Sequence, residues 1–128
     1  MKKTKVLVVE DDLLSMELVT DLLEVAGYEV LPAETAEEGI EIAIAGTPAL
    51  ILMDIRLPGI DGLTATAILK DDPRTTHIPI VALTASTMRG DERKCLEAGC
   101  TGYIAKPINT REFAKTVAGY VRPLCRNC

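Results

Sequence analysis

Ala49-Leu50-Ile51-Leu52-Met53-Asp54-Ile55-Arg56-Leu57-Pro58-Gly59 is the stretch that decides the fold, because an apolar run ends there in a carboxylate and then in Pro-Gly. An apolar run without a polar face is typical of a strand buried on both sides, in a parallel sheet covered by helices. Pro58 and Gly59 break the chain directly afterwards, which places Asp54 at the carboxyl end of the strand. Ligands bind at that edge in open α/β sheets, so Asp54 is the first candidate functional residue.

A second apolar run, residues 5–9, also ends in acids, namely Glu10, Asp11 and Asp12. Asp12 by itself is explained as the N-cap of the helix that follows. A cluster of acids facing Asp54 from a neighbouring strand is not explained by capping. If the two strand ends are adjacent, their negative charges repel one another by several kcal/mol in a partly desolvated site. We therefore expect a cation between them.

Strands and helices alternate along the rest of the chain. The expected strands are 5–9, 28–31 (ended by Pro32), 49–54, 78–83 and 102–105, and the expected helices are 13–26, 35–46 (opened by a Thr35–Glu38 capping box and closed by Gly46), 62–71 (capped by Asp61), 91–98 (ended by Gly99) and 109–122 (opened by Asn109 and ended by Pro123). Five strand-helix units predict a parallel sheet with helices on both faces and right-handed crossovers.

Apolar residues at helical spacing predict which face of each helix is buried. The expected inward residues are Leu14, Leu18, Leu22 and Val25 in the first helix, Ala36, Ile40, Ala43 and Ile44 in the second, Leu63, Ala67 and Leu69 in the third, and Phe113, Val117, Tyr120 and Val121 in the last. The third helix has only a narrow apolar stripe.

Composition limits the classes of function. The chain has 128 residues, 48% of them hydrophobic and 26% charged, which indicates one globular domain over residues 1–128 with no room for an appended output domain. A formal net charge of −5 argues against nucleic-acid binding, which needs clustered Lys and Arg. No segment approaches about 18 consecutive apolar residues, and no signal peptide is evident, so a soluble cytoplasmic protein with no membrane partner is expected.

The four cysteines and the single histidine are not expected to bind a metal. Cys125 and Cys128 have C-x-x-C spacing, but they lie in the last four residues, with no strand leading into them as a redox motif requires. Cys95 and Cys100 flank a predicted helix end and are expected to be small core residues. His77 is expected to be solvated in a loop, which leaves too few soft ligands for a structural zinc.

The strand ends together bring one set of chemical groups to the same edge of the sheet. Besides the acids, Thr84 follows the fourth strand and Lys106 the fifth. Carboxylate oxygens suit Mg²⁺, which prefers few protein ligands, several waters and a phosphate oxygen. A carboxylate can also accept a phosphoryl group, provided that a metal and a Lys neutralise its charge.

These residues resemble the receiver domain of two-component response regulators (the CheY-like superfamily), and the resemblance covers essentially the whole chain. Its parts are Val8-Val9-Glu10-Asp11, Met53-Asp54-Ile55-Arg56-Leu57-Pro58-Gly59-Ile60-Asp61-Gly62, Ala82-Leu83-Thr84-Ala85 and Gly102-Tyr103-Ile104-Ala105-Lys106-Pro107. The resemblance implies a doubly wound (βα)5 α/β fold, flavodoxin-like or CheY-like, with a five-stranded parallel sheet in the order 2-1-3-4-5.

The resemblance also implies a role for each site residue. Asp54 would be phosphorylated from a phosphohistidine of a sensor histidine kinase or histidine phosphotransfer protein. Mg²⁺, for which Mn²⁺ may substitute, would be bound by Asp11, Asp54 and the backbone carbonyl of Arg56, with Glu10 acting through a water. The phosphoryl contacts would come from Lys106, the Thr84 hydroxyl and the Ala85 amide, while Arg56 and Ser86 tune the lifetime of the acyl phosphate and a cis Lys106–Pro107 bond aims the ammonium. The chain would catalyse its own phosphorylation and slow dephosphorylation without being an enzyme for another substrate.

Phosphorylation is expected to act as a switch. The phosphoryl group adds charge and acceptor oxygens that draw Thr84 inward, and Tyr103 then turns from an outward to an inward position. This changes the face made by the fourth helix, the fifth strand and the fifth helix, where a downstream protein would bind and where self-association into a homodimer is a second expectation. The unphosphorylated protein should visit the active arrangement as a minor state.

Three other interpretations of the sequence compete with a self-contained receiver domain. A haloacid-dehalogenase-type phosphohydrolase needs a second acid two residues after its nucleophile, where this chain has Arg56. A flavodoxin-like redox protein would bind phosphate in its first loop, and the acids at residues 10–12 would repel it. The third alternative is a receiver domain excised from a hybrid histidine kinase or a larger regulator.

Overall fold

The fold was analysed in a computed structural model, which describes residues 4–57, 59–84, 89–106 and 108–121. Its elements are β1 (Lys5–Val9), α1 (Leu13–Val25), β2 (Glu29–Ala33), α2 (Ala36–Gly46), β3 (Leu50–Asp54), α3 (Gly62–Asp71), β4 (Ile80–Thr84), α4 (Arg89–Ala98), β5 (Gly102–Ala105) and α5 (Phe113–Val121). The five strands are parallel and lie in the order β2-β1-β3-β4-β5. The predicted fold class and strand order are confirmed.

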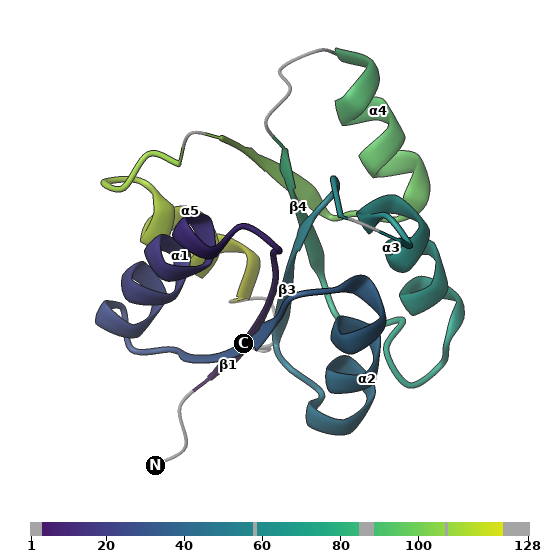
Figure 1. The fold of residues 1–128 in the computed structure, drawn as a ribbon, viewed down its shortest axis with the longest axis horizontal. Helices are drawn as coiled ribbons and strands as arrows, with labels where there is room; N and C mark the ends of the chain where they lie inside the picture. The colour runs from purple at the N-terminus through teal and green to yellow at the C-terminus, as the bar shows by residue number, and fades with distance from the viewer. Residues whose placement is uncertain (1–3, 58, 85–88, 107, 122–128) are drawn as a thin grey trace.

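Helices cover both faces of the sheet, with α1 and α5 on one side and α2, α3 and α4 on the other (Figure 1). Because successive strand residues point to opposite faces, each strand supplies both layers of the core. Leu7, Val9, Ile51 and Met53 pack toward α2 and α3, whereas Val6, Val8, Leu50 and Leu52 pack toward α1 and α5. This double burial is why β1 and β3 have no polar face.

The inward face of α1 differs from the prediction. The helix buries Val19 and Leu23, while Leu14 and Val25 are 74% and 89% exposed and Leu18 is also exposed. The helix is apolar on more than one side, so the spacing of its apolar residues does not decide which side is buried. The predicted stripe lies one residue before the stripe that faces the sheet. Of the predicted stripe, Leu22 is half-buried and packs against the core, whereas Leu14, Leu18 and Val25 are exposed.

Strand β2 continues through Pro32 to Ala33, although Pro32 was predicted to end it. The carbonyl of Ala33 accepts a hydrogen bond from the Glu10 N–H (3.0 Å), so Ala33 faces β1. Backbone polar groups alternate in direction along a strand, and Pro32 therefore faces the outer edge of the sheet. An edge strand tolerates proline at such a position because no ladder hydrogen bond is lost.

The predicted helix caps are present. Asp12, Thr35 and Asp61 accept hydrogen bonds from Ser15, Glu38 and Thr64 N–H groups at the starts of α1, α2 and α3. The Asn109 side chain accepts from the N–H groups of Arg111 and Glu112, but α5 proper begins only at Phe113.

Three further details of the helices differ from the prediction. The Glu38 carboxylate accepts from the Glu34 N–H rather than from Thr35, one residue beyond a standard capping box. Gly46 is the last residue of α2, and the left-handed C-cap position is taken by Thr47, whose φ is 40°. In α3, Ala67 is exposed and its neighbour Thr66 is buried. Burial of Thr66 is tolerated because its hydroxyl donates to the Gly62 carbonyl (2.8 Å) within the helix.

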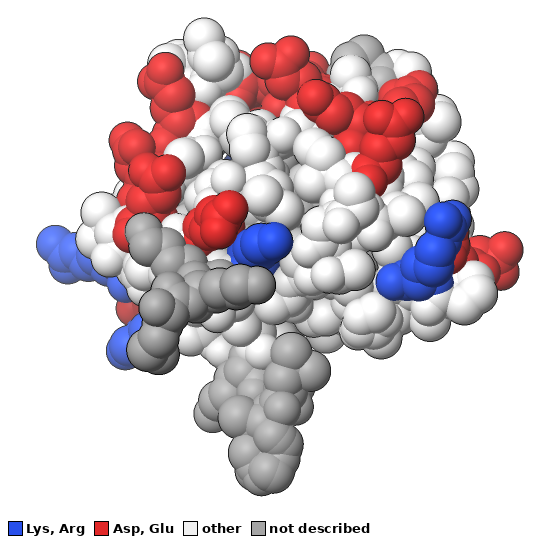
Figure 2. Space-filling model, turned by 90° about the horizontal axis from the view of Figure 1, so that it is seen from below, with Lys and Arg blue, Asp and Glu red and all other residues white. Residues whose placement is uncertain are grey.

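Cys95 and Cys100 are buried in the core and His77 is exposed, as predicted. Pro58, the Lys106–Pro107 bond, Pro123, Cys125 and Cys128 involve residues outside the described ranges. On the face shown in Figure 2, Asp and Glu side chains are widespread and the Lys and Arg side chains stand apart from one another. Within the residues described above, no helix is both long and apolar enough to cross a bilayer.

Candidate functional site

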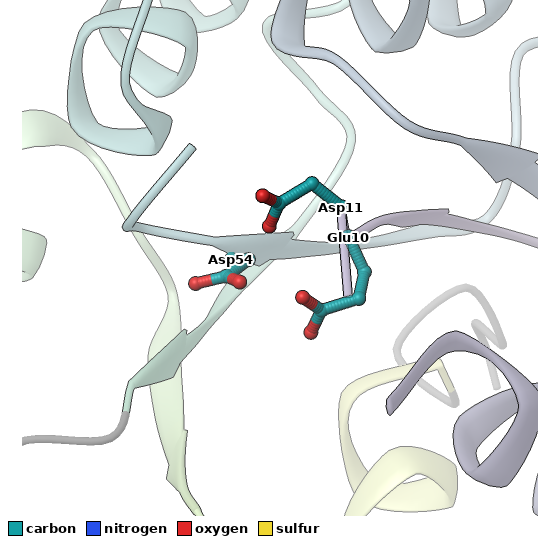
Figure 3. A group of neighbouring side chains, drawn as sticks. All are labelled: Glu10, Asp11 and Asp54. Carbon is teal, nitrogen blue, oxygen red and sulfur yellow. The ribbon is translucent and has the colours of Figure 1, made fainter. Parts of the chain in front are cut away.

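Three carboxylates meet at the carboxyl edge of the sheet. Strands β1 and β3 are neighbours with Val9 opposite Met53, so the residues that follow these two, Glu10 and Asp54, lie at the same level of the sheet. Oxygen atoms of Glu10, Asp11 and Asp54 all lie within 4.8 Å of one another. Figure 3 shows the three side chains converging from the ends of the two strands. The predicted crowding of negative charge is confirmed.

Burial makes this crowding costly. Glu10 is 1% and Asp54 6% exposed, whereas Asp11 is open to solvent. Asp12 does not join the cluster, because its carboxylate caps α1 and only its N–H reaches Glu10 (3.2 Å to Oε2). Two of the three clustered carboxylates are therefore shielded from water, where like charges repel more strongly.

Lys106 brings a positive charge to the cluster from the end of the edge strand β5. Its Nζ lies 2.7 Å from Glu10 Oε1 and 3.3 Å from Asp54 Oδ2. Its backbone N–H donates to the carbonyl of Thr84 (2.7 Å), which fixes the start of its loop against the end of β4. Asp54, Asp11 and Lys106 are thus brought together as the sequence predicted.

One ammonium does not neutralise three carboxylates. Burial raises the pKa of Glu10 to about 7, and its contact with Asp54 adds to the rise while Lys106 opposes it. For Lys106, burial opposes the charged form, but the contacts with Glu10 and Asp54 outweigh burial and raise its pKa. The site therefore holds excess negative charge that Glu10 partly relieves by retaining a proton near neutral pH.

The residues present fit a hard divalent cation. Their donor atoms are carboxylate oxygens, which Mg²⁺ and Mn²⁺ prefer over nitrogen or sulfur. Asp11 is exposed, so one side of the cluster is open to water molecules, of which Mg²⁺ keeps several. A cation here would also relieve the repulsion that raises the pKa of Glu10.

Asp54 is held at both of its oxygens. The Arg56 N–H donates to Oδ1 (3.0 Å), and Lys106 lies near Oδ2. For Arg56, the resemblance implied a carbonyl ligand and a tuning side chain, but this hydrogen bond from its amide was not predicted. The signal was available, since Asp side chains commonly accept a hydrogen bond from the backbone N–H two residues later.

Gly62 is a second residue that the sequence analysis did not assign to the site. A Cβ at Gly62 would lie 2.2 Å from the Asp54 carbonyl oxygen and 2.7 Å from Ile55 Cα. Its N–H also donates to the Ile55 carbonyl (3.3 Å). The start of α3 therefore rests directly on the backbone of the residue that carries the central carboxylate, and only glycine allows this approach.

The remaining predicted site residues lie around this centre. Thr84 is fully buried at the end of β4, and Tyr103 is 38% exposed on β5, the outward position from which the predicted turn would start. The Arg56 side chain is exposed beside the site. Ala85 and Ser86 lie outside the described residues, and the inward movement of Thr84 and Tyr103 stays a prediction.

Comparison with known proteins gives consistent matches over nearly the whole chain. The family model described as "Response regulator receiver domain" matches residues 6–118. The polar-differentiation response regulator DivK of Brucella ovis is 44% identical over 116 residues, which cover 91% of this chain and 94% of DivK.

Two solved structures are also similar. One is the receiver domain of sensor histidine kinase PA1611 from Pseudomonas aeruginosa, with a magnesium ion coordinated in its active site cleft (30% identity, TM-score 0.88, 94% of this chain and 99% of that chain). The other is a co-crystal structure of Saccharomyces cerevisiae Ypd1, a histidine phosphotransfer protein, with the receiver domain of its downstream response regulator Ssk1 (29% identity, TM-score 0.86, 94% and 90%).

Proposed function

The chain belongs to the family of response regulator receiver domains, and on that premise we propose that Asp54 is the residue that accepts a phosphoryl group in a two-component phosphorelay. The observation that carries the proposal is the position of Asp54. It is the last residue of a buried strand, with two further carboxylates on one side and the Lys106 ammonium on the other. No such arrangement is needed to stabilise the end of a strand.

The donor would be a phosphohistidine on a sensor histidine kinase or a histidine phosphotransfer protein. An Asp54 carboxylate oxygen attacks the phosphorus, the P–N bond breaks, and the histidine nitrogen leaves with the bonding electrons. Lys106 stabilises the charge on the phosphoryl oxygens, and the Arg56 amide keeps the carboxylate oriented. Catalysis of this step by the chain itself, and slow hydrolysis of the acyl phosphate afterwards, are parts of the proposal.

Mg²⁺, or Mn²⁺ in its place, would be held by Asp11, Asp54 and the Arg56 carbonyl, with Glu10 acting through a water. When bound, the ion supplies positive charge that neutralises the transferring phosphoryl group. The clustering of three carboxylates supports this assignment, as does the magnesium ion in the similar PA1611 receiver domain.

Thr84 and the amide of Ala85 would contact the attached phosphoryl group, and Arg56 and Ser86 would set the lifetime of the acyl phosphate. Thr84 lies at the end of β4, and its carbonyl is directly hydrogen-bonded to the Lys106 amide, which supports a shared response of the two residues. Tyr103 would then turn inward. The buried position of Thr84 and the exposed position of Tyr103 are the starting points that this switch needs.

We place the docking surface for the phosphohistidine protein on the exposed apolar side chains of α1, as an extension of the proposal. Leu13, Leu14 and Leu18 are exposed, and the helix begins directly after the acids of the site. A donor must bring its histidine to Asp54, so a surface bordering the site is the one it can cover. The Ypd1–Ssk1 complex supports the class of partner.

The downstream partner would bind the face formed by α4, β5 and α5, which is also the surface proposed for a phosphorylation-dependent homodimer. A cavity of about 350 Å³ lies between β5 and α5, lined by Tyr103, Phe113 and Thr116 among others. The organisation as one receiver domain over residues 1–128 and the cytoplasmic location are likewise proposals. The match to DivK over most of its length supports the first, and favours a regulator over a domain excised from a kinase.

The test is incubation with acetyl phosphate, with and without Mg²⁺, followed by intact mass measurement. The wild-type chain should gain one phosphoryl group only with Mg²⁺, and Asp54→Asn should gain none. Asp61→Asn is the matched control, because Asp61 caps α3 nearby and asparagine is an equally good cap. Phosphorylation of Asp54→Asn, or label on another residue of the wild type, would refute the assignment.

Docking on α1 is tested separately with a phosphorylated histidine phosphotransfer protein as donor. Leu14→Asp should slow transfer from the protein donor but not from acetyl phosphate. Val25→Asp is the control, since Val25 is exposed on the same helix about 16 Å farther along its axis. Equal slowing by both substitutions, or by neither, would exclude this surface.

A further inference from the structure

Helix α4 ends in a motif that sets two side chains against each other. Gly99 has a φ of 113°, and its N–H donates to the Leu96 carbonyl (3.1 Å). The next residue, Cys100, donates its N–H to the carbonyl of Cys95 (3.0 Å). This pair of hydrogen bonds is a Schellman motif, in which the side chains of the first and last residues commonly touch. In α4 those two residues are both cysteines.

Helix α1 ends in the same motif with different side chains. Gly27 has a φ of 98° and donates to the Glu24 carbonyl, and Tyr28 donates to the carbonyl of Leu23, both at 3.0 Å. Leu23 and Tyr28 pack in one hydrophobic cluster. The C-terminal motif of α1 therefore pairs a leucine with a tyrosine, whereas the same motif in α4 pairs two cysteines.

The two thiols share one buried environment. Cys95 is fully buried and Cys100 is 6% exposed, in the core cluster packed toward α2 and α3. Cys100 Sγ lies 4.0 Å from Thr66 Oγ1. Burial raises the pKa of the Cys100 thiol to about 11, and the neighbouring Cys95 thiol adds to the rise. The two thiols therefore lie in the same apolar region of the core, at the two ends of the Schellman motif.

The backbone is also compatible with a covalent link. With a 3.0 Å hydrogen bond from the Cys100 nitrogen to the Cys95 oxygen, standard bond lengths limit the Cα separation to roughly 7 Å at most. Disulfides span Cα separations of about 4.4–6.8 Å. The motif thus holds the two cysteines near bridging distance before any reaction occurs.

We propose that Cys95 and Cys100 are an oxidative modification site, at which a peroxide converts the two thiols into one intramolecular disulfide. One thiolate attacks a peroxide oxygen, the O–O bond breaks, and the released hydroxide takes up a proton, which leaves a sulfenic acid. The sulfur of the second thiol displaces its hydroxyl group as water. In total, two thiols and one hydrogen peroxide give one disulfide and two waters.

The link would join the last turn of α4 to Cys100, which lies two residues before the start of β5. Strand β5 carries Tyr103 and leads to Lys106, so the disulfide would restrain the two elements through which phosphorylation is proposed to act. None of the residues around Asp54 takes part in the oxidation. The modification site therefore does not depend on the proposed phosphoryl chemistry, and either can fail without the other.

The test uses the full chain with Cys125→Ser and Cys128→Ser, so that Cys95 and Cys100 are the only thiols left; oxidation of the four methionines adds about 16 Da each and is separated from the loss of about 2 Da by peptide mapping. Hydrogen peroxide is added under native conditions, and intact mass and peptide mapping follow. We expect a loss of about 2 Da and, after cleavage at Glu97, two peptides joined through Cys95 and Cys100. Because the reactive form is the thiolate, the rate should rise about tenfold from pH 7 to pH 8. Cys95→Ala and Cys100→Ala should each abolish the loss.

Two further measurements keep the proposal falsifiable if a variant folds poorly. Phenylarsine oxide, which bridges close thiols with release of water, should bind the unoxidised chain in a one-to-one ratio. In the oxidised chain, hydrogen exchange of the Cys100 amide should slow, because the disulfide holds its acceptor, the Cys95 carbonyl, in place. No mass loss, a cross-link that forms only in urea, or failure to bind the arsenical would overturn the proposal.

Discussion

Replacing Gly62 with alanine tests how closely the start of α3 must approach the end of β3. The new Cβ would lie 2.2 Å from the Asp54 carbonyl oxygen, and ordinary contact begins at 3.4 Å, so one backbone segment must move by about 1.2 Å. Displacement of a reacting group by about 1 Å can cost roughly 10²-fold in rate. We expect Gly62→Ala to be phosphorylated by acetyl phosphate about 10²-fold more slowly than the wild type.

Stability must be measured beside the rate. Overpacking costs about 1–3 kcal/mol, and the better helix propensity of alanine returns up to about 1 kcal/mol, so the unfolding free energy should fall by at most about 3 kcal/mol. Gly39→Ala is the matched control, because its Cβ would meet a methyl group of Val9 at 2.7 Å rather than backbone. It should lose stability but be phosphorylated at close to the wild-type rate.

The assay is stopped-time mass spectrometry at saturating Mg²⁺, with urea denaturation of each variant. A folded Gly62→Ala chain that is phosphorylated at the wild-type rate would refute the reasoning. Equal loss of rate in Gly62→Ala and Gly39→Ala would also refute it, since the effect would then follow stability and not the position of Asp54.

Three other predictions concern the charges of the site and one strained residue. Lys106→Met should tighten Mg²⁺ binding by roughly tenfold in calorimetry, because the ammonium competes for Glu10 and Asp54, yet slow phosphorylation by about 10²-fold; weaker Mg²⁺ binding would contradict this. Since the pKa of Glu10 is raised from 4.5 to about 7, Mg²⁺ affinity should fall as pH drops below about 7. Without Mg²⁺, the unfolding free energy should fall as pH rises from 4.5 to 7, because in this range the native state still holds the Glu10 proton and the unfolded state has lost it. A Mg²⁺ affinity or an unfolding free energy that does not change with pH would contradict the corresponding expectation. Thr47→Gly should raise the unfolding free energy by about 0.5–1 kcal/mol in urea denaturation, because it relieves a left-handed threonine; a loss would show that the threonine side chain stabilises the turn.

Sequence reasoning predicted the strand ends well because buried parallel strands have a strong signal. The runs before Glu10 and Asp54 have no polar face, and each stops at residues with a clear chemical meaning. Once the order of strands was expected, the meeting of these acids with Lys106 followed from topology. The helix caps could be predicted because each capping side chain and its backbone partner lie within a few residues of each other in the sequence.

Contacts that depend on tertiary packing were beyond the sequence pattern. Leu14 and Val25 have the spacing of a core face, but α1 is apolar on several sides, and only packing against β1 and β2 decides its rotation. The role of Gly62 depends on where the backbone of Asp54 passes, which no local pattern reveals. Similarly, Thr66 is buried because its hydroxyl finds an acceptor inside its own helix.

Because of Pro32, the two edge strands of the sheet differ in how readily a strand of another chain can pair with them. An incoming extended segment at β2 would need a donor where the proline ring has none, so that border resists templated growth into ribbons or fibres. Strand β5 forms the opposite border and contains no proline. Unwanted polymerisation through backbone pairing is therefore disfavoured on one side by covalent structure, whatever conformation the chain adopts.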